Sequence, residues 1–283
     1  MNKIKIKNND ISLLETDDLI TITLSDKLEI FDVQKMNIEV FGSTEIEIIY
    51  DEKQESKLDI EYNIDSNIEL KITEIRKEAK AKIQYKYNIL ENSNVKVIKF
   101  YDSKVIKELD IVNLNGMNSE IDYLLKTIAT DKQDYNIYVY HNNKNTISNI
   151  KNNSVNINEG TTTFNVTGVV YNGITNCILN QMNKIINLND KECKINPILL
   201  IEENDVVANH SALIGKFSEE EIFYLMSRGI SRKDSINLLT KGFLINGTQN
   251  ETINKIIEKY SSWGWFYESW RFSIIKKRNN IFW

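Results

Sequence analysis

The sequence predicts a mainly β protein that ends in a small helical region. From about residue 18 to about residue 207, apolar and polar residues alternate in runs such as Ile20–Leu24 and Ile68–Ile72. This alternation indicates strands with one buried face. Strand runs recur roughly every 8–12 residues, a spacing typical of an all-β domain. At Ser218 the apolar period becomes helical, so we expect a β core over 1–215 and a helical domain over 216–283.

The strands are expected in order along the first of these regions. Clear examples are Ile46–Ile48, Leu58–Tyr62, Ile83–Tyr87, Val95–Ile98 and Tyr135–Tyr140, all rich in β-branched or aromatic residues. Acidic residues occupy alternate positions opposite the apolar ones, which favours a solvated sheet face over paired catalytic carboxylates. No strict repeat of fixed length is visible, so periodicity alone leaves a sandwich, a barrel and a solenoid open.

Two segments interrupt the alternation. Glu74–Lys82 is charged and indicates either a helical turn or a solvated strand edge. Met117–Thr127 places Ile121, Leu124 and Leu125 at helical spacing, which predicts a short helix.

Three helices are expected after the strands. The run Ser218–Glu221 is a capping box that begins the first helix, and Gly229 is expected to end it as a left-handed cap. Ser231 is expected to begin a second helix that ends at Gly242, and a third is predicted from about 250 to about 260. The tail beyond them contains all four tryptophans and suggests docking onto the body or onto a protein partner. Its tryptophans are Trp263, Trp265, Trp270 and Trp283.

Composition narrows the class of protein. The 283 residues are 41% hydrophobic and 27% charged, which is typical of a soluble globular chain. A net charge of −5 disfavours general binding to nucleic acid or to an anionic membrane. Two cysteines and two histidines exclude a disulfide scaffold and a self-contained zinc finger. Without a signal peptide or a long apolar run, the expected location is cytoplasmic, with both thiols reduced. With 1 proline and 10 glycines, other residues such as Asn, Asp, Lys and Ser must form the turns.

Motifs for common catalytic chemistry are absent from the sequence. The segment Gly242–Gln249 comes nearest to a phosphate-binding loop, but it lacks the lysine and follows a helix, so we interpret it as a helix cap and a turn. His141 is interpreted as a strand-end residue beside a turn, and Cys177 as a buried structural thiol. Cys193 lies in a polar turn beside two lysines, where it is either an exposed thiol of lowered pKa or an inert surface thiol.

A series of motifs late in the chain resembles a known family. Pro197–Ile201 and Asp205–Val206 are followed by Asn209–Gly215, then by Phe223–Ser231, and finally by Gly242–Phe243. Their order resembles that of the SufB/SufD family, scaffold components of iron–sulfur cluster assembly. The match is firm over residues 197–243 and extends more weakly from about 168, where Asn180–Asn183 resembles the family's Q-x-N step. The resemblance implies a right-handed parallel β-helix followed by C-terminal helices, without a counterpart of the family's N-terminal helical region.

The resemblance also implies a role, partners and site residues. The chain is expected to be a non-enzymatic scaffold that pairs through the β-helix with itself or with a SufB-type subunit. It is expected to bind an ABC-type ATPase, SufC, and to bind no nucleotide of its own. His210 is the implied ligand of a transient iron–sulfur cluster, and Cys193 is a candidate ligand or sulfur-accepting thiol, close to the family's cysteine position but shifted by about a residue. Many SufD-type sequences have cysteine where this chain has Ala208. The candidate ATPase contacts are Ile222, Phe223, Tyr224, Met226, Arg228, Gly229 and Ile230.

Two alternative functions remain open at this point. The segment Ser218–Gly242 is compatible with a DNA-binding helix-turn-helix, with Arg232, Lys233 and Lys241 as its basic residues. A β-helix enzyme acting on carbohydrates is the other alternative, and it requires acidic and basic residues gathered on one face.

Overall fold

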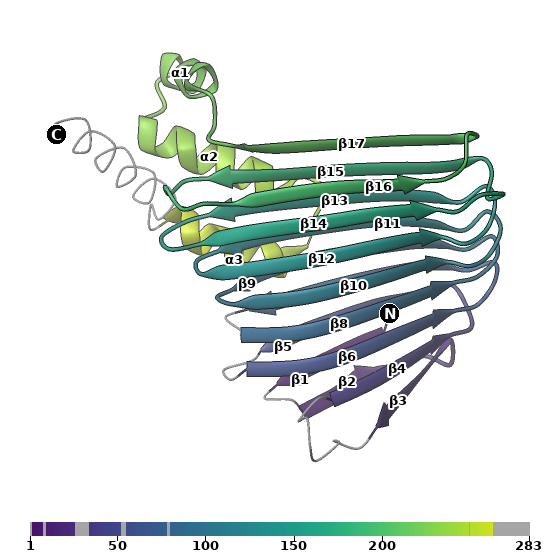
Figure 1. Cartoon of the computed structure of the whole chain (residues 1–283). Coiled ribbons are helices and arrows are strands. Elements are labelled where there is room, and N and C mark those ends of the chain that lie inside the picture. The colour runs from purple at the N-terminus through teal and green to yellow at the C-terminus, as the bar shows by residue number, and fades with distance from the viewer. Residues whose placement is uncertain are drawn as a thin grey trace.

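Two parallel β-sheets form a solenoid in the computed structural model of the chain (Figure 1). The structure describes residues 2–7, 10–25, 34–51, 55–77, 80–248 and 250–262. The strands are β1 (Asn2–Lys7), β2 (Asp10–Glu15), β3 (Ile20–Ser25), β4 (Gln34–Val40), β5 (Thr44–Asp51), β6 (Glu55–Ile64), β7 (Glu69–Lys77), β8 (Lys80–Ile89), β9 (Asn94–Ser103), β10 (Ile106–Leu114), β11 (Glu120–Ala129), β12 (Lys132–His141), β13 (Ile147–Asn156), β14 (Thr161–Val170), β15 (Cys177–Asn187), β16 (Lys194–Ile201) and β17 (Val206–Gly215). The helices are α1 (Glu219–Ser227), α2 (Arg232–Ile245) and α3 (Glu251–Ser262).

From β4 onward, successive strands alternate between the two sheets. One sheet has the order β17-β15-β13-β11-β9-β7-β5-β1-β2, and the other has the order β16-β14-β12-β10-β8-β6-β4-β3. From β5 onward every strand is parallel to its neighbours, whereas β2 and β3 pair antiparallel with β1 and β4. The fold class predicted for the chain, a parallel β-helix followed by short helices, is confirmed.

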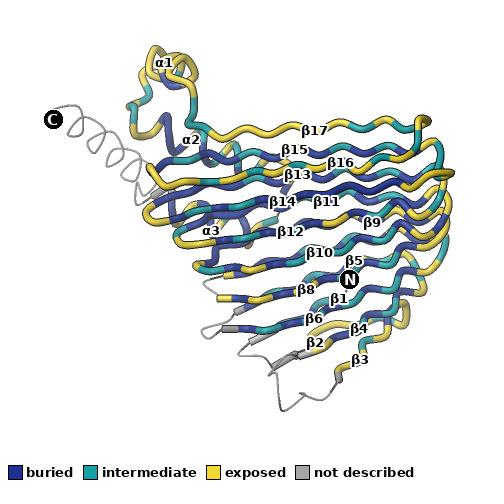
Figure 2. The backbone as a smooth tube through the Cα atoms, in the orientation of Figure 1, coloured by how far each residue is buried: buried dark blue, intermediate teal, exposed yellow. Residues whose placement is uncertain are grey.

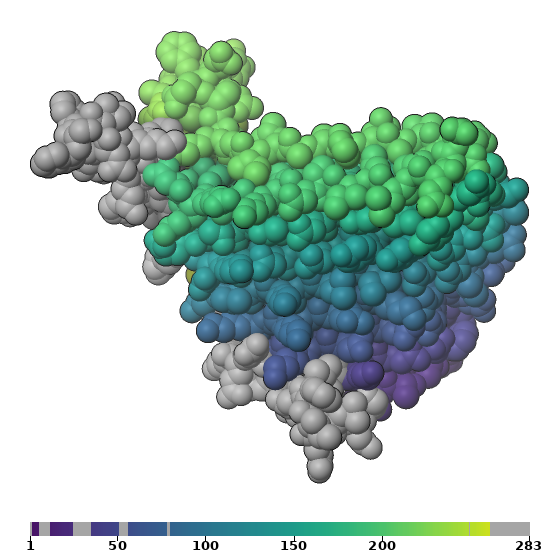
Figure 3. All heavy atoms as spheres, in the orientation of Figure 1, coloured from purple at the N-terminus to yellow at the C-terminus, as the bar shows by residue number. Residues whose placement is uncertain are grey.

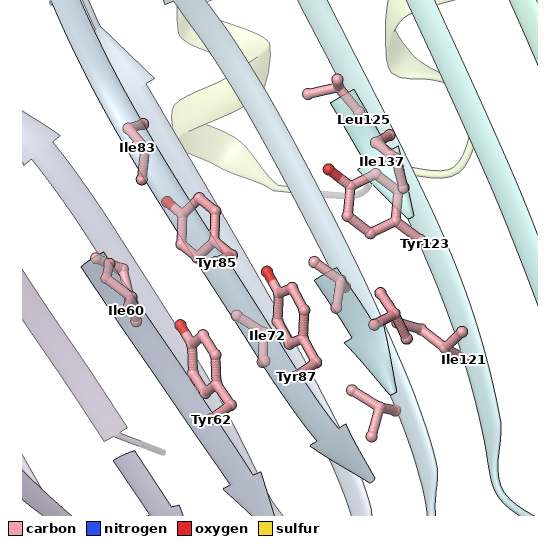
Figure 4. Packing of buried hydrophobic residues seen from close by; sticks show 14 of the residues in the cluster. Ile60, Tyr62, Ile72, Ile83, Tyr85, Tyr87, Ile121, Tyr123, Leu125 and Ile137 are labelled. Carbon is pink, nitrogen blue, oxygen red and sulfur yellow. The ribbon is translucent and has the colours of Figure 1, made fainter. Parts of the chain in front are cut away.

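The solenoid core is built from inward-facing rows of aliphatic and tyrosine side chains. Tyr62 and Tyr87, on neighbouring strands, stack with ring centroids 5.1 Å apart. Figure 4 shows these rings beside Tyr85 and Tyr123, with isoleucines filling the space between them. Because residues in register on parallel strands point to the same side, the inward-facing side chains form rows along the solenoid axis.

Asparagine takes the place of glycine at one set of bends. Asn67, Asn92, Asn118, Asn145 and Asn176 all have φ between 53° and 62°, the left-handed region that asparagine tolerates better than most residues. Each side-chain amide donates to the side-chain oxygen of the asparagine one turn earlier, over 2.8 to 3.1 Å. We call these five residues the bend ladder. Their separations of 25, 26, 27 and 31 residues are the repeat that a search for one fixed period cannot find.

The short helix predicted over Met117–Thr127 is wrong, because most of this segment belongs to β11. The inward face of β11 contributes Tyr123 and Leu125 to the core, while Ile128 on its outward face packs beneath the helices. With both faces covered, the strand loses the polar alternation that would have identified it. Of the segment Glu74–Lys82, the described residues 74–77 belong to β7 and 80–82 to β8.

The prediction that acidic residues lie on a solvated face is wrong for three of them. Glu74, Glu108 and Asp110 point into the solenoid and are at most 1% exposed. Lys99, also fully buried, donates to Glu108 and to Asp110 over 2.9 Å each. The Lys99 ammonium also lies 3.5 Å from the centroid of the Tyr85 ring. Burial raises the pKa of Asp110 above its usual value, against the opposing effect of the Lys99 charge.

The helices begin as the sequence predicts. Ser218 accepts from the Glu221 N–H and completes the capping box, and Gly229 follows α1 with a φ of 84°. Ser231 caps α2. The predicted end at Gly242 is wrong, since α2 continues to Ile245 and Gly247 takes the positive φ.

The helices α2 and α3 cover the outer face of the β7–β15 sheet. Isoleucines and leucines of the helices share one apolar cluster with Ile75, Phe100, Ile128 and Val155 of the strands. Lys126 reaches out from β11 and donates to the main-chain oxygens of Phe243, at 2.8 Å, and of Asn246. Figure 2 shows α1 mostly exposed, whereas one side of α3 is buried. The division into domains at residue 215 stays a prediction, although strand does give way to helix there.

None of the helices that the structure describes is long and apolar enough to span a membrane. The tryptophan-rich tail, residues 263–283, lies outside the described residues, and its predicted docking stays a prediction.

Candidate functional site

The C-terminal end of the solenoid is formed by β16 and β17, the last strand of each sheet (Figure 2). Among the described residues, each of these strands pairs along one edge only. Apolar side chains stand exposed on both strands. Leu200 is 54% exposed and Val207 is 57% exposed, and Leu213 and Ile214 are exposed to a similar extent. This end therefore presents unpaired main-chain groups next to apolar side chains.

His210 lies in the middle of β17, and its Cα partner on β15 is Gln181. Gln181 is 5% exposed and faces inward. The imidazole therefore belongs to an inward-facing row, but it is exposed because no further strand stacks on β17. Below it, Gln181 donates to the Ile198 carbonyl, and its side-chain oxygen has no partner among the described residues. A ligating side chain thus stands at the uncovered end above a buried polar group.

A buried pair of amides lies two residues further along β15, between this strand and β13. Asn152 donates to Asn183 over 2.8 Å, and both are at most 1% exposed. Gln181 and Asn183 are the polar residues of the Q-x-N step noted in the sequence. Their polar character at positions that alternation assigns to the core is the signal that could have placed them inside the solenoid.

Cys193 lies just before β16, half-buried against the solenoid core. The Asn156 amide approaches its sulfur to 2.9 Å. Burial raises the pKa of the thiol, so the hypothesis of a lowered pKa is wrong. The neighbouring lysines are occupied elsewhere, since Lys191 pairs with Glu159 and Lys194 with Glu192.

His210 and Cys193 lie at different positions along the strands at the C-terminal end of the solenoid. Cys193 precedes β16 at the turn where β15 ends, and β17 ends at this same side of the solenoid (Figure 1). His210 stands five residues before Gly215, the end of β17, which amounts to roughly 17 Å of strand. In the part of the chain that the structure describes, no three His, Cys, Asp or Glu side chains gather in a metal-binding group.

The other histidine and cysteine are structural. His141 is fully buried at the end of β12, with its ring nitrogens 2.7 Å from the Thr146 hydroxyl and 2.9 Å from the Ser148 hydroxyl. Burial lowers the pKa of His141 to about 4, so the imidazole is neutral. Cys177 is 1% exposed, as predicted for a core thiol.

The helix α1 carries a separate exposed patch. Only Ile222 of this helix is buried. Phe223 is 71% exposed, and Tyr224 and Met226 stand exposed beside it. Arg228 lies over the Tyr224 ring, 5.3 Å from its centroid. We call Phe223, Tyr224 and Met226 the α1 patch.

The basic residues of the helix-turn-helix alternative are partly occupied. Arg232 pairs with Glu219 at 2.7 Å, and Lys241 pairs with Glu258 at 3.4 Å. These pairs leave little positive charge on the segment for a phosphate backbone.

Several known proteins are similar to this chain in sequence. The family described as "SUF system FeS cluster assembly, SufBD core domain" matches residues 33–243. The iron–sulfur cluster assembly protein SufD of Bacillus subtilis is 33% identical over 105 residues, covering 34% of this chain and 24% of that protein. A SufBD family protein of Archaeoglobus fulgidus is 52% identical over 40 residues, or 14% of this chain and 11% of its own length. One of Mycobacterium leprae is 28% identical over 157 residues, half of this chain and 17% of its own. The matched stretches thus span about a quarter or less of these relatives.

Proposed function

The chain belongs to the SufBD family of iron–sulfur cluster assembly proteins, and from this premise we propose that it is a scaffold subunit on which a cluster is assembled at a paired solenoid end. The observation that carries the proposal is the uncovered edge of β17 with His210 in its middle. The cluster is the cargo of this scaffold.

The first element of the proposal is pairing through β17. A strand with one unpaired edge is a template for a strand of another chain. Ten residues of β17 offer main-chain groups, and the exposed Val207 and Leu213 offer apolar surface. The partner is a second copy or a SufB-type subunit. Pairing there covers His210, which otherwise stays open to water.

The second element is the ligand set. Imidazole ligates iron in mixed iron–sulfur sites. Since the described residues gather no complete set of ligands, donors from the paired chain complete the shell around the cluster. Cys193 lies away from the middle of β17, and its raised pKa disfavours the thiolate that ligation and sulfur acceptance both require. His210 is therefore the stronger candidate of the two.

The third element is an ATPase bound at the α1 patch. Exposed aromatic and Met side chains beside an Arg are enriched at protein interfaces. A SufC-type subunit seated there supplies ATP hydrolysis in trans. The turn residues Arg228, Gly229 and Ile230 extend the contact. Ile222 is buried in the apolar cluster between the helices and the sheet.

Anaerobic reconstitution with iron and sulfide tests the cluster site. Wild type, His210→Ala and the neighbouring Ser211→Ala are each co-expressed with the ATPase, purified, and examined by visible absorption. We expect a cluster in wild type and in Ser211→Ala, whose side chain faces outward, and its loss in His210→Ala. Equal cluster content in all three proteins would reject His210 as a ligand.

Co-purification tests the ATPase contact separately. Phe223→Asp is compared with Leu90→Asp, which places the same charge at an exposed leucine of a distant bend. We expect only Phe223→Asp to lose the ATPase, with its thermal unfolding unchanged. Retention of the ATPase by Phe223→Asp would contradict the assignment of the α1 patch.

A further inference from the structure

The outer face of the β4–β16 sheet carries a groove that the scaffold role does not use. Its cavity volume is about 610 Å³, within the range typical of small-molecule sites. It lies across β4, β6, β8, β10 and β12, on the face turned to the viewer in Figure 3. Four lysines line it, with Leu109 and Tyr138 at its apolar side.

Three of these lysines stand in one straight row. Lys57, Lys82 and Lys107 are direct Cα partners on the neighbouring strands β6, β8 and β10. We call them the lysine row. Strand spacing puts their Cα atoms about 4.8 Å apart, and like charges placed directly opposite one another destabilise a sheet. Among the residues that the structure describes, none forms an ion pair with the lysine row.

Several lysines elsewhere on the outer faces stand opposite acids, although Lys71 also has Lys96 as its register partner on β9. Lys71 pairs with its register partner Glu45 at 3.2 Å, and Lys86 pairs with Glu61 at 2.8 Å. Lys3 and Lys35 pair in the same way with Glu47 and Asp59. Beyond Lys107 the row meets Asp134 on β12, but Asp134 is paired with Lys132 at 3.2 Å.

The lysine row is thus an unneutralised line of positive charge in a chain of net charge −5. We propose that it binds a linear oligophosphate, which lies in the groove. Each ammonium supplies three donors, and lysine is a common phosphate ligand. The bound anion then reduces the repulsion within the row and supplies the negative charge that acidic partners would otherwise provide.

The spacing favours phosphate over an acidic peptide. Side chains on one face of an extended peptide recur every 6.6–6.8 Å, roughly two residues, which is out of step with ammonium groups carried about 4.8 Å apart. A phosphate chain carries charge on every unit and can meet each lysine. The row spans only about 10 Å, which is too short for the many phosphate contacts of a nucleic acid.

The chemistry leaves two sources of the phosphate chain, inorganic oligophosphate and a nucleotide. Tyr138, 36% exposed, and Leu109 lie at the side of the groove where a nucleobase would stack. Equal affinity for tripolyphosphate and ATP would show that the groove recognises the phosphate chain alone. If ATP binds more tightly than tripolyphosphate and Tyr138→Ala abolishes this difference, the ligand is a nucleotide.

Titration calorimetry with sodium tripolyphosphate tests the proposal on the full chain. We expect saturable binding of one tripolyphosphate per chain and far weaker binding of monophosphate. Lys82→Gln, which removes the middle of the row, is expected to weaken binding by about tenfold or more. Lys71→Gln removes the same charge from the other sheet and is expected to leave binding unchanged.

Thermal unfolding gives an independent measurement. Tripolyphosphate is expected to raise the Tm of wild type and of Lys71→Gln but not that of Lys82→Gln. Without ligand, Lys82→Gln itself is expected to be as stable as wild type or more so, because repulsion within the row is reduced. Absence of saturable binding, equal weakening by both substitutions, or equally tight binding of an oligoglutamate peptide would each overturn the proposal. These outcomes do not depend on cluster assembly or on the ATPase.

Discussion

In the middle of the solenoid the inward rows carry Lys99, Glu108 and Asp110, whereas at its C-terminal end they carry Gln181 and His210. In the middle, Lys99 pairs with Glu108 and with Asp110 at 2.9 Å, and less than 2% of each side chain is exposed. At the end, His210 is exposed, and the side-chain oxygen of Gln181 has no partner among the described residues. Charged groups inside a protein need partners fixed in advance, while groups that await a ligand must stay accessible. The same inward position is therefore filled by paired charges in one region and, under the proposed function, by a ligand-binding side chain in the other.

Lys99→Met has the largest effect that we expect. It leaves Glu108 and Asp110 buried without their cation, which costs about 3–5 kcal/mol of unfolding free energy. Urea unfolding measures the loss. Lys71→Met, at an exposed pair, is the matched control and is expected to cost about 1 kcal/mol or less. If both variants lost the same stability, the middle of the solenoid would not be the closed region described above.

The buried His141 predicts a pH dependence. Its pKa is about 4 in the folded protein because of burial, and about 6.5 when unfolded. The unfolded state therefore binds the proton more tightly, and stability is lost as pH falls from 6.5 toward 4. The loss approaches about 3 kcal/mol at pH 4. His141→Gln is expected to lack this component, so the stability difference between wild type and variant changes with pH in this window. A constant difference from pH 7 to pH 4 would contradict the prediction.

The bend ladder predicts a smaller effect. Asn118→Ala places alanine at a φ of 59° and removes a bond to Asn92, which together cost about 1–2 kcal/mol. Asn118→Gly keeps the backbone conformation accessible and isolates the loss of the ladder bonds. Denaturant unfolding of the two variants separates the contributions. Greater damage from glycine than from alanine would show that the left-handed conformation is not the cost.

His210→Ala has the smallest expected effect on stability. The side chain is exposed and has no partner that holds the fold together, so its removal is expected to change unfolding free energy by about 0.5 kcal/mol or less. Scanning calorimetry of the unpaired chain measures it. A loss comparable to that of Lys99→Met would mean that the end is packed as the middle is, and the contrast between the two regions would fail.

Much of the fold can be predicted from the sequence, because strands and the first turns of helices depend on residues that are close together in the chain. Alternation identified the strands, and Ser218 with Glu221 identified the start of α1 within its own four residues. The order of motifs from Pro197 to Phe243 pointed to the family. These are local patterns, and local contacts enforce them.

Burial was decided only by the tertiary structure. Glu74 and Glu108 alternate with apolar neighbours much as the exposed acids do, yet the solenoid closes around them. Because the helices cover the outer face of β11, this strand lacks polar alternation, and the sequence predicts a helix there. The free edge at His210 and the unpaired row at Lys82 depend on residues stacked 25 or more positions apart. The physical reason is that a parallel solenoid sets the surroundings of each side chain through the turns above and below it, and no local period records them.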